Sequence, residues 1–404
     1  MKCVQGWRQF TLIAASALVV IFVCSASASA EAKETVLYNF GCGTDGCDPT
    51  GNLARDSQGD LYGTTETGGD PTCNCGTVFE LMPVQGGGWT ETVLHAFTDG
   101  DDGYTPSSGV IFDGSGNLYG VTAGGGTGSC ACGTVFKLTH SGSTWTKSVI
   151  YSFQNFANGA TPIGGLVFDK SGNLYGTTES GGASDSGTVF KLTPSADNWN
   201  QVVIYNFSGQ RDGARPYTNL AIDRSGSLYG TTTSGGSYNE GTVFRLVPSQ
   251  SGWIESTIWD FTPDAYGSYG VIVHGNAIFG TANGGAFNAG VVFELTPAVG
   301  IWNFTAIYEF TGGRDGGEPD AGVTADPSHL YGTTYWGGQY ASGTVFRLTH
   351  QSNGTWAEGV LYNFTGETDG ENPHSQLLLG PAGLFGYANN NTNGDGLVYE
   401  ITAP

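Results

Sequence analysis

The sequence predicts an all-β fold, a seven-bladed β-propeller built from four-stranded blades. A unit of fifty-odd residues recurs seven times, each unit holds four short β-like runs, and no segment after the N-terminal leader shows a sustained helical period. Short strands at this spacing, repeated in tandem, are typical of propeller blades. We therefore expect a signal peptide over residues 1–30 and a single propeller domain over residues 31–404.

The first thirty residues have the pattern of a secretory leader. Lys2 and Arg8 precede an uncharged stretch, residues 10–23, which the small-residue run SASASA follows up to Ala30. The apolar stretch is about 14 residues long, where a membrane-spanning helix needs about 20. We expect cleavage before Glu31, no membrane span after cleavage, and a location that is secreted, periplasmic or in the cell envelope. Lipidation at Cys24 is disfavoured because Val23, rather than a small residue, precedes it.

The first run after the leader predicts how the ring closes. Residues 35–40 (TVLYNF) match the fourth strand of the later units, whereas the last unit ends in YEITAP without such a strand. Counting this first copy gives seven outer strands for seven units. We therefore expect residues 36–40 to pair into the last blade and to cover strand edges that would otherwise invite aggregation.

Two landmarks mark every unit. LYGTT begins at Leu61, and related segments begin 57, 56, 54, 50, 52 and 54 residues further on in turn, weakened in the fifth and seventh units. About fifteen residues after each comes GTVF or a close variant, first at Gly76. The third unit gives the four expected strands clearly: 165–169, 173–178, 187–193 and 201–207, each rich in β-branched or aromatic residues.

Recurrent turn and tryptophan positions have a structural explanation. The pattern D-x-x-G-N-L-Y, as in residues 113–119, predicts a tight hairpin between the first two strands, with aspartate bonding to its own turn and glycine supplying a positive φ. Six units carry a tryptophan just before the outer strand. Because these tryptophans keep the same register, we expect them to pack between blades rather than to stack on a sugar; they are Trp89, Trp145, Trp199, Trp253, Trp302 and Trp356.

The loop from each outer strand to the next inner strand carries Asp-Gly-x-x-Pro. This loop and the glycine-rich loop before GTVF should emerge on one face, around the mouth of the central channel. A ring of side chains there would bind a cation or a basic ligand, although we favour the alternative that aspartate and proline shape the turn. The candidate ligand-binding residues are Asp102, Asn158, Asp212, Asp315 and Asp369, with a shortened form of the loop around Asp45.

The cysteines predict disulfides. Six of the eight lie after the leader, all between residues 42 and 132, and an even number in an exported chain is typical of disulfide pairs. The C-x-C spacing differs from that of zinc or thioredoxin sites, and local pairing is favoured among many possible connectivities. The disulfide candidates are Cys42, Cys47, Cys73, Cys75, Cys130 and Cys132.

The net charge and the spacing of possible metal ligands limit which macromolecules and metal ions the protein is expected to bind. The formal charge of −22 becomes −24 when the leader and its two basic residues are removed, so the surface repels nucleic acid and anionic lipid. The six histidines show no metal-ligand spacing. The run from Asp99 to Asp102 and the loop 389–395 offer oxygen ligands for Ca²⁺ without the full EF-hand pattern. We expect no cofactor, with Ca²⁺ as the one candidate.

The joined motifs DG-x-x-P, G-N-LYGTT, GG and GTVFKL resemble the GloVer tandem repeat of secreted bacterial proteins. The resemblance covers essentially all of residues 35–404 and implies an exported bacterial repeat protein without implying a particular activity. Proteins with this repeat often carry C-terminal surface anchors. This chain departs from them in having no apolar tail or sorting segment before Pro404, which puts surface anchoring in question.

No residue set forms a catalytic signature, so the leading functional hypothesis is an extracellular or cell-envelope binding module, monomeric, for a protein or glycan ligand. The alternative is a polysaccharide-acting lyase or hydrolase with its site at the channel mouth. Catalysis needs an asymmetric group, and the fifth unit is the most divergent. There residues 262–270 replace the Asp-Gly-x-x-Pro loop, which makes Tyr266, Tyr269 and His274 weak catalytic candidates; drift in one blade explains them equally well.

Overall fold

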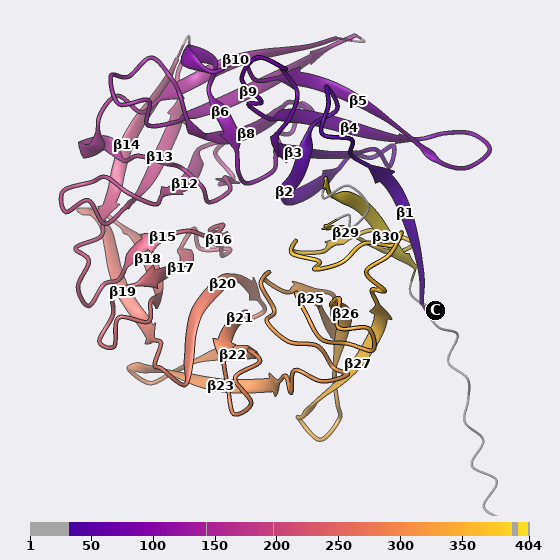
Figure 1. Cartoon of the computed structure of the whole chain (residues 1–404). Coiled ribbons are helices and arrows are strands. Elements are labelled where there is room, and N and C mark those ends of the chain that lie inside the picture. Colours follow the sequence, from indigo (N-terminus) through magenta and orange to yellow (C-terminus); the bar gives the residue numbers. More distant parts are fainter. Residues whose placement is uncertain (1–31, 143, 197, 390–394, 403–404) are drawn as a thin grey trace, which may run out of the picture.

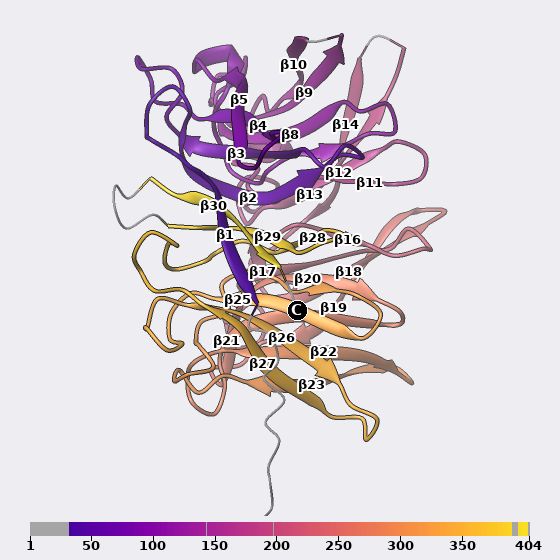
Figure 2. The same ribbon diagram turned by 90° about the vertical axis from the view of Figure 1, so that its right-hand side faces the viewer.

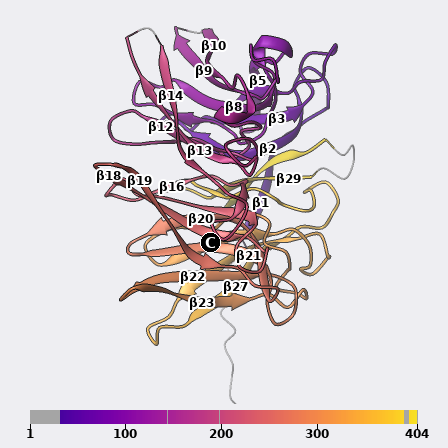
Figure 3. The same ribbon diagram turned by 90° about the vertical axis from the view of Figure 1, so that its left-hand side faces the viewer.

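The computed structural model describes residues 32–402 apart from residues 143, 197 and 390–394, and it shows seven β-sheets arranged in a ring (Figure 1). The chain runs once around the ring, as the colour sequence in Figure 1 shows. Figures 2 and 3 show the ring edge-on from its two sides, with loops projecting at both faces. This arrangement confirms the predicted propeller. The predicted signal peptide lies outside the described residues.

The first three blades contain β2 to β14, with the first strand of each nearest the ring centre. Blade 1 consists of β2 (Cys47–Arg55), β3 (Leu61–Thr67), β4 (Thr77–Pro83) and β5 (Trp89–Ala96). Blade 2 consists of β6 (Tyr104–Pro106), β7 (Ile111–Phe112), β8 (Leu118–Gly124), β9 (Thr134–Ser141) and β10 (Thr144–Ser152). Blade 3 consists of β11 (Val167–Phe168), β12 (Leu174–Thr178), β13 (Thr188–Pro194) and β14 (Trp199–Asn206).

The next three blades follow the same plan. Blade 4 consists of β15 (Ala214–Pro216), β16 (Ala221–Ile222), β17 (Leu228–Ser234), β18 (Thr242–Ser249) and β19 (Gly252–Asp260). Blade 5 consists of β20 (Ala265–His274), β21 (Ala277–Gly284), β22 (Val291–Ala298) and β23 (Ile301–Glu309). Blade 6 consists of β24 (Thr324–Ala325), β25 (His329–Thr334), β26 (Thr344–His350) and β27 (Trp356–Asn363). In blades 2 and 4 an interrupted first strand is recorded as two short pieces.

Blade 7 is completed by the N-terminal strand. It consists of β28 (Leu378–Leu379), β29 (Leu384–Ala388), β30 (Leu397–Thr402) and β1 (Lys33–Asn39). β1 pairs antiparallel with β30 from Lys33↔Thr402 to Asn39↔Leu397, and the two strands lie side by side in Figure 1. The predicted closure of the ring is therefore confirmed.

The core lies between neighbouring blades, where aromatic rings meet edge to face. The aromatic residue of each GTVF landmark packs on the phenylalanine that follows the outer strand of the preceding blade, with ring centroids 5.0–5.7 Å apart. The pairs are Phe40–Phe79, Phe97–Phe136, Phe153–Phe190, Phe207–Phe244, Phe261–Phe293, Phe310–Phe346 and Phe364–Tyr399. Such a pair adds about 0.5–1.5 kcal/mol beyond the burial itself. The LYG glycine admits this ring, since a Cβ on Gly120 would stand 2.5 Å from Phe136.

The six repeated tryptophans also bridge blades, as predicted. Each packs against the aromatic residue of the LYG landmark in the preceding blade, with ring centroids 5.7–6.5 Å apart. The pairs are Trp89–Phe385, Trp145–Tyr62, Trp199–Tyr119, Trp253–Tyr175, Trp302–Tyr229 and Trp356–Phe279. At the seventh junction the N-terminal strand supplies Ala32 at this register position, and Ala32 is buried in one cluster with Tyr331.

The predicted hairpins between the first and second strands of the blades lie on one face of the ring. In the second unit Asp113 accepts hydrogen bonds from the backbone N–H groups of Ser115 and Asn117 at 2.8 and 2.9 Å. The Tyr119 hydroxyl donates to the second carboxylate oxygen at 3.0 Å. This face is called the hairpin face below, and the face that carries the glycine-rich and Asp-Gly loops is called the loop face. No helix in the described part of the chain has the length and hydrophobicity needed to cross a bilayer.

Candidate functional site

One backbone hydrogen bond fixes the start of every inner strand at the centre of the loop face. In each blade a residue with left-handed φ, between 50° and 57°, donates its N–H to the carbonyl just before the GTVF glycine of the preceding blade, at 2.7–3.2 Å. The donors are Asp48, Thr105, Thr161, Arg215, Gly267, Glu318 and Asn372. Left-handed backbone costs a residue with a side chain about 1–2 kcal/mol. Its recurrence shows that the junction between blades determines the conformation.

The proline of each Asp-Gly-x-x-Pro loop comes next and lies against that same glycine. A Cβ on Gly133, for example, would stand 2.5 Å from Cδ of Pro162. The fifth blade has Ser268 in place of proline, and the corresponding Gly241 has no proline among its closest neighbours. The backbone hydrogen bond and the contact between proline and glycine together hold the residues after the proline at an equivalent place in each blade.

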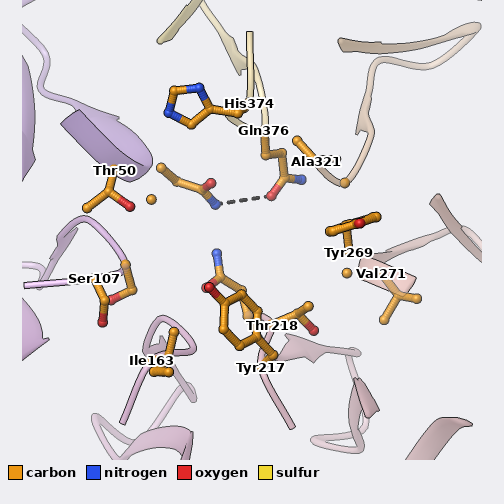
Figure 4. A pocket seen from close by; sticks show the side chains of 16 residues that line it. Thr50, Ser107, Ile163, Tyr217, Thr218, Tyr269, Val271, Ala321, His374 and Gln376 are labelled. Carbon is orange, nitrogen blue, oxygen red and sulfur yellow. Dashed lines mark hydrogen bonds between the residues drawn. The ribbon is translucent and has the colours of Figure 1, made fainter. Parts of the chain in front are cut away.

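Those following residues line the central channel. They enclose a cavity of about 240 Å³ to which all seven blades contribute (Figure 4). The lining residues are Thr50, Gly51, Asn52, Ser107, Ser108, Ile163, Tyr217, Thr218, Asn219, Tyr269, Gly270, Val271, Ala321, Gly322, His374 and Gln376. Figure 4 shows the labelled side chains grouped around this cavity, which we call the channel mouth.

The channel mouth differs in chemistry from blade to blade, although the rest of each unit is repeated. The first lining position holds Thr50, Ser107, Ile163, Tyr217, Tyr269, Asp320 and His374 in blades 1 to 7; Asp320 adjoins the lining residue Ala321. Seven equivalent backbone positions thus present two hydroxyls, one alkyl group, two phenols, one carboxyl and one imidazole. An asymmetric set of polar groups in a concave site is what a ligand needs to bind in one orientation.

Side-chain amides bridge the blades deeper in the channel. The Asn52 amide donates to the Gln376 amide oxygen at 3.0 Å, the dashed line of Figure 4. Gln376 in turn donates to the Val323 carbonyl at 2.8 Å. Asn219 accepts from the Gly165 N–H. These bonds orient the amides, so the channel wall is preorganised.

One side of the channel mouth holds a phenol and a carboxyl group in contact. Tyr269 accepts a hydrogen bond from the Asn283 amide at 2.8 Å and is hydrogen-bonded to Asp320. Burial, and then the nearby charge of Glu318, raise the pKa of Asp320 to about 6, against the lowering effect of the Tyr269 hydrogen bond. Burial is also the main cause that raises the pKa of Tyr269 to about 12. Asp320 therefore exchanges a proton near neutral pH.

A hydroxyl without a partner and an acidic rim complete the channel mouth. Ser108 is 7 % exposed, and its Oγ has no hydrogen-bond partner although it lines the cavity. On the rim, Tyr217 is 49 % exposed, and partial burial followed by the charges of Glu66 and Glu179 raises its pKa. Arg215 lies 3.6 Å from Glu179 and balances part of this charge.

The predicted Asp-Gly-x-x-Pro carboxylates are placed on the loop face, but none of them lines the cavity. Four of them share one set of contacts: a tyrosine hydroxyl of the preceding outer strand donates at 2.8–3.2 Å, and the N–H four residues earlier donates at 2.7–2.8 Å. These four are Asp45, Asp212, Asp315 and Asp369. Asp102 instead lies 3.0 Å from His95 and 2.6 Å from Lys147. Asn158 is hydrogen-bonded to Tyr151. A ligand-binding role for these residues stays a prediction.

The next blade places one outer-strand side chain against each of these loops. Five of these loops carry aspartate, and the outer-strand side chain that faces it is glutamate in four cases and lysine in one. The loop that carries asparagine faces glutamine. The pairs are Glu91–Asp45, Lys147–Asp102, Gln201–Asn158, Glu255–Asp212, Glu358–Asp315 and Glu34–Asp369. The fifth blade has Phe304 at this position, stacked on Trp259 with ring centroids 4.6 Å apart.

Burial perturbs the glutamates of these pairs. Burial, followed by the charge of the paired aspartate, raises the pKa of Glu91 and of Glu358 to about 7. The same two causes raise the pKa of Glu34 to about 7. For Glu255 burial is again the largest cause and the pKa is about 6. Asp102 shows the reverse: burial raises its pKa, but hydrogen bonds from His95 and Lys147 outweigh that effect and hold it well below the usual range.

The three weak catalytic candidates are separated by the structure. Tyr269 lines the channel mouth. Tyr266 lies at the loop-face end of β20, while His274 ends the same strand at the hairpin face, in a different cavity with Glu294 and His329. The expected cluster of Tyr266, Tyr269 and His274 is therefore absent from the described structure, because seven residues of β20 lie between Tyr266 and His274.

The cysteines pair locally, as favoured from the sequence: Cys42–Cys47, Cys73–Cys75 and Cys130–Cys132. Among the described residues one group of possible metal ligands comes together, Cys42, Cys47 and Asp395, but its two sulfurs are joined in a disulfide. The run Asp99 to Asp102 forms no such group in the described chain. Residues 390–394 of the second calcium candidate lie outside the described residues. Calcium binding stays untested.

Sequence reasoning missed Tyr217, Asp320 and His374. The signal for them was present: the residues between the repeated proline and the following leucine or valine vary among the seven units, although both flanking positions are nearly constant. Variation inside a fixed frame is the pattern expected of a specialised site. The amide bridges across blades, by contrast, could not be found without coordinates.

The fold and this channel mouth define a repeat β-propeller with a polar central cavity. The family described as the Gloeobacter/Verrucomicrobia repeat matches residues 20–244, 126–303 and 223–404, so the chain belongs to that family. No curated protein matches the chain significantly.

Several solved structures share the fold. A polysaccharide lyase of family PL25, an ulvan lyase, is 11 % identical, with 92 % of this chain and 96 % of that chain covered and a TM-score of 0.55. Its complex with -[GlcA(1-4)Rha3S]- gives 10 % identity, the same coverage and a TM-score of 0.52. A Trypanosoma rangeli sialidase in complex with sialic acid gives 11 % identity, 92 % and 59 % coverage and a TM-score of 0.45. Identities this low show the fold alone.

Proposed function

We propose that the chain is an exported binding module that holds its ligand at the channel mouth. One observation carries the proposal: six of seven equivalent positions line a single cavity and the seventh, Asp320, adjoins it, yet these positions carry different side chains in a chain built from repeats. Packing needs repeated residues at repeated positions. Different side chains at equivalent positions around one cavity support selection for a ligand.

The chemistry of the channel mouth favours a neutral or basic ligand with several hydrogen-bonding groups. Ser108 offers an unpartnered hydroxyl, and the oriented amides of Asn52 and Gln376 offer fixed partners. The rim carboxylates Glu66 and Glu179 repel anions. A protein segment or a glycan would both meet these conditions.

Export is part of the proposal. The leader pattern of residues 1–30 supports it, and so do three local disulfides, which persist in oxidising compartments. We expect a secreted, periplasmic or envelope-bound monomer, without nucleic-acid partners.

The test is a thermal-shift screen of residues 31–404 against glycans, basic peptides and Ca²⁺, because a ligand that binds only the native state raises the Tm. We expect a hit whose shift is lost in Tyr217→Ala and Asp320→Asn and kept in Lys170→Ala, which alters the hairpin face. A hit that survives both channel variants would contradict the proposal, as would a shift that Lys170→Ala removes.

A second candidate, a polysaccharide hydrolase or lyase, draws on the Tyr269–Asp320 contact. A carboxyl group with a pKa of about 6 beside a phenol is suited to proton transfer near neutral pH. New reducing ends released from polysaccharide by the protein, and not by Asp320→Asn or Tyr269→Phe, would support catalysis. Binding without any cleavage would exclude it for the polysaccharides tried.

A further inference from the structure

Exposed aromatic side chains gather on one face of this protein. In the described part of the chain five aromatic residues are exposed: Phe156, Tyr217, Tyr238, Phe287 and Tyr340. All five belong to loops of the loop face in blades 3 to 6, or to the segments that join them. Among the described residues, the hairpin face has as many turns between strands, yet the large hydrophobic side chains that it exposes are all aliphatic. Random surface exposure would not favour one face in this way.

Three of these residues occupy one position in consecutive blades. The glycine-rich loop reads GGSYNEG, GGAFNAG and GGQYASG in blades 4, 5 and 6, with Tyr238, Phe287 and Tyr340 in fourth place. Their exposed fractions are 58, 60 and 52 %. The following residue has left-handed φ in all three loops, 64°, 53° and 64°. We call these three side chains the aromatic arc, since they occupy the same loop position in three consecutive blades of the ring.

The loops that carry the arc are held by the same hydrogen bonds in all three blades. In each, the N–H just before the aromatic residue donates to the side chain that ends the outer strand of the same blade. Ser237 bonds to Asp260 at 3.0 Å, Ala286 to Glu309 at 2.9 Å, and Gln339 to Asn363 at 2.8 Å. The glycines close each loop by a second bond, at 2.8–3.1 Å. Rings on such loops lose little freedom when a ligand binds, which favours affinity.

Blade 3 has the same loop without the ring. Its sequence is GGASDSG, the N–H of Ala183 donates to Asn206 at 3.0 Å, and Asp185 has left-handed φ. Ser184 stands in fourth place, so the loop does not need an aromatic residue for its conformation. The rings of blades 4 to 6 therefore serve something outside the fold.

The structure assigns the aromatic arc to a linear polysaccharide that lacks anionic groups, a deepening of the proposed function that rests on it. Sugar rings have apolar C–H faces that pack on aromatic rings, while their hydroxyls bond to polar neighbours. Each arc ring has only alanine or a polar residue on either side of it in its loop, so the loops supply no further large apolar side chain for the contiguous core of a protein interface. One ring per blade matches a ligand with a repeating unit. The acidic chain, with a formal charge of −22, repels polyanions such as uronans.

The experiment is native affinity electrophoresis of residues 31–404 in gels containing hydroxyethyl cellulose, xyloglucan, glycol chitosan or alginate. We expect retardation by at least one of the first three and none by alginate. Tyr238→Ser, Phe287→Ser and Tyr340→Ser each reproduce the blade 3 loop, so the Tm should stay unchanged. Each should weaken binding about tenfold, the effect of losing one aromatic contact. Ser184→Tyr adds a fourth ring and should strengthen binding several-fold.

The outcomes separate this inference from the proposed function. If the triple serine variant binds as tightly as the parent, or if alginate is the best ligand, the assignment of the arc is wrong. Loss of binding in Tyr217→Ala alone, with the triple variant unaffected, would also overturn the assignment and leave a channel-mouth site standing. If no polysaccharide retards the parent protein while a basic peptide raises its Tm, the ligand class is wrong and the binding module remains.

Discussion

At the scale of single residues, two positions on neighbouring blades have matched chemistry. The loop position holds aspartate where the facing outer-strand residue is glutamate or lysine, and asparagine where it is glutamine. The blade that lacks the loop has Phe304 there. A carboxylate facing a buried glutamate is tolerated because the glutamate can keep its proton. The junction therefore accepts any pair that avoids two buried negative charges.

Glu358→Gln should stabilise the protein at pH 8 and leave it unchanged at pH 5. At pH 8 the buried Glu358 is ionised beside Asp315, and a neutral amide removes this repulsion and can donate to the aspartate. The gain should be on the order of 1 kcal/mol, since solvent screens a partly exposed pair, or about 2 °C in Tm. Thermal unfolding at the two pH values measures it.

The matched control is Gln201→Glu. The Gln201 amide donates to the Asn158 backbone carbonyl at 3.3 Å, a bond that a carboxylate cannot make. Gln201→Glu should therefore lower the Tm at pH 8 and lower it less at pH 5, where a protonated glutamic acid can donate. Equal Tm values for parent and Glu358→Gln at pH 8 would contradict the assignment of a strained carboxyl pair.

At the scale of elements, β1 is the strand whose deletion should lower the Tm most. It supplies the fourth strand of blade 7, and Phe40 packs on Phe79 of blade 1. Deleting residues 31–40 exposes β30 and two blade faces. The Tm should fall by more than 10 °C, because several large buried side chains lose their contacts together.

Calorimetry of the truncated chain and of the full chain measures this loss, and addition of the peptide 31–40 is the control. The peptide should restore part of the lost Tm by occupying the vacant place beside β30. An unchanged melting curve after truncation would mean that β1 does not close the ring.

The elements were largely predictable from sequence because a repeat supplies seven observations of one unit. LYG and GTVF gave the second and third strands, and the unpaired first copy at residues 35–40 gave the closure. The split of the inner strand into β6 and β7, or β15 and β16, was not predicted, and the hydrogen bond to the preceding blade does not explain it, because all seven blades make that bond. For the site, the sequence predicted only the face of the ring on which it lies. The Asp-Gly loops were found because they repeat, whereas Asp320 and His374 were missed because they do not.

At the scale of the whole molecule, the glutamates and aspartates whose pKa values are shifted by folding predict a stability maximum in mildly acidic solution. Four glutamates have folded-state pKa values of about 6 to 7, above the ordinary 4.5. Their contribution is complete below pH 4.5 and is lost as the pH rises through 6 to 7. Aspartates such as Asp102 and Asp113 have lowered pKa values, so their contribution is lost below the ordinary 3.8.

The Tm should therefore peak near pH 4 to 5 and decline between pH 5 and 8. A series of melting curves at constant ionic strength measures the profile. The variant carrying Glu34→Gln, Glu91→Gln, Glu255→Gln and Glu358→Gln should flatten the decline. A parent Tm that rises from pH 5 to pH 8 would contradict the assigned shifts.

The pairing of β1 with β30 also sets the order in which the molecule is completed. Lys33 and Thr402, whose atoms are hydrogen-bonded, are 369 residues apart. Ribosomes add about 5–20 residues per second, so the strand made first waits roughly 20 s or longer for its partner. During that time it is an unpaired edge beside unfinished blades. The strand begins with three polar residues, Lys33, Glu34 and Thr35, so one end of it stays hydrophilic while it waits for β30.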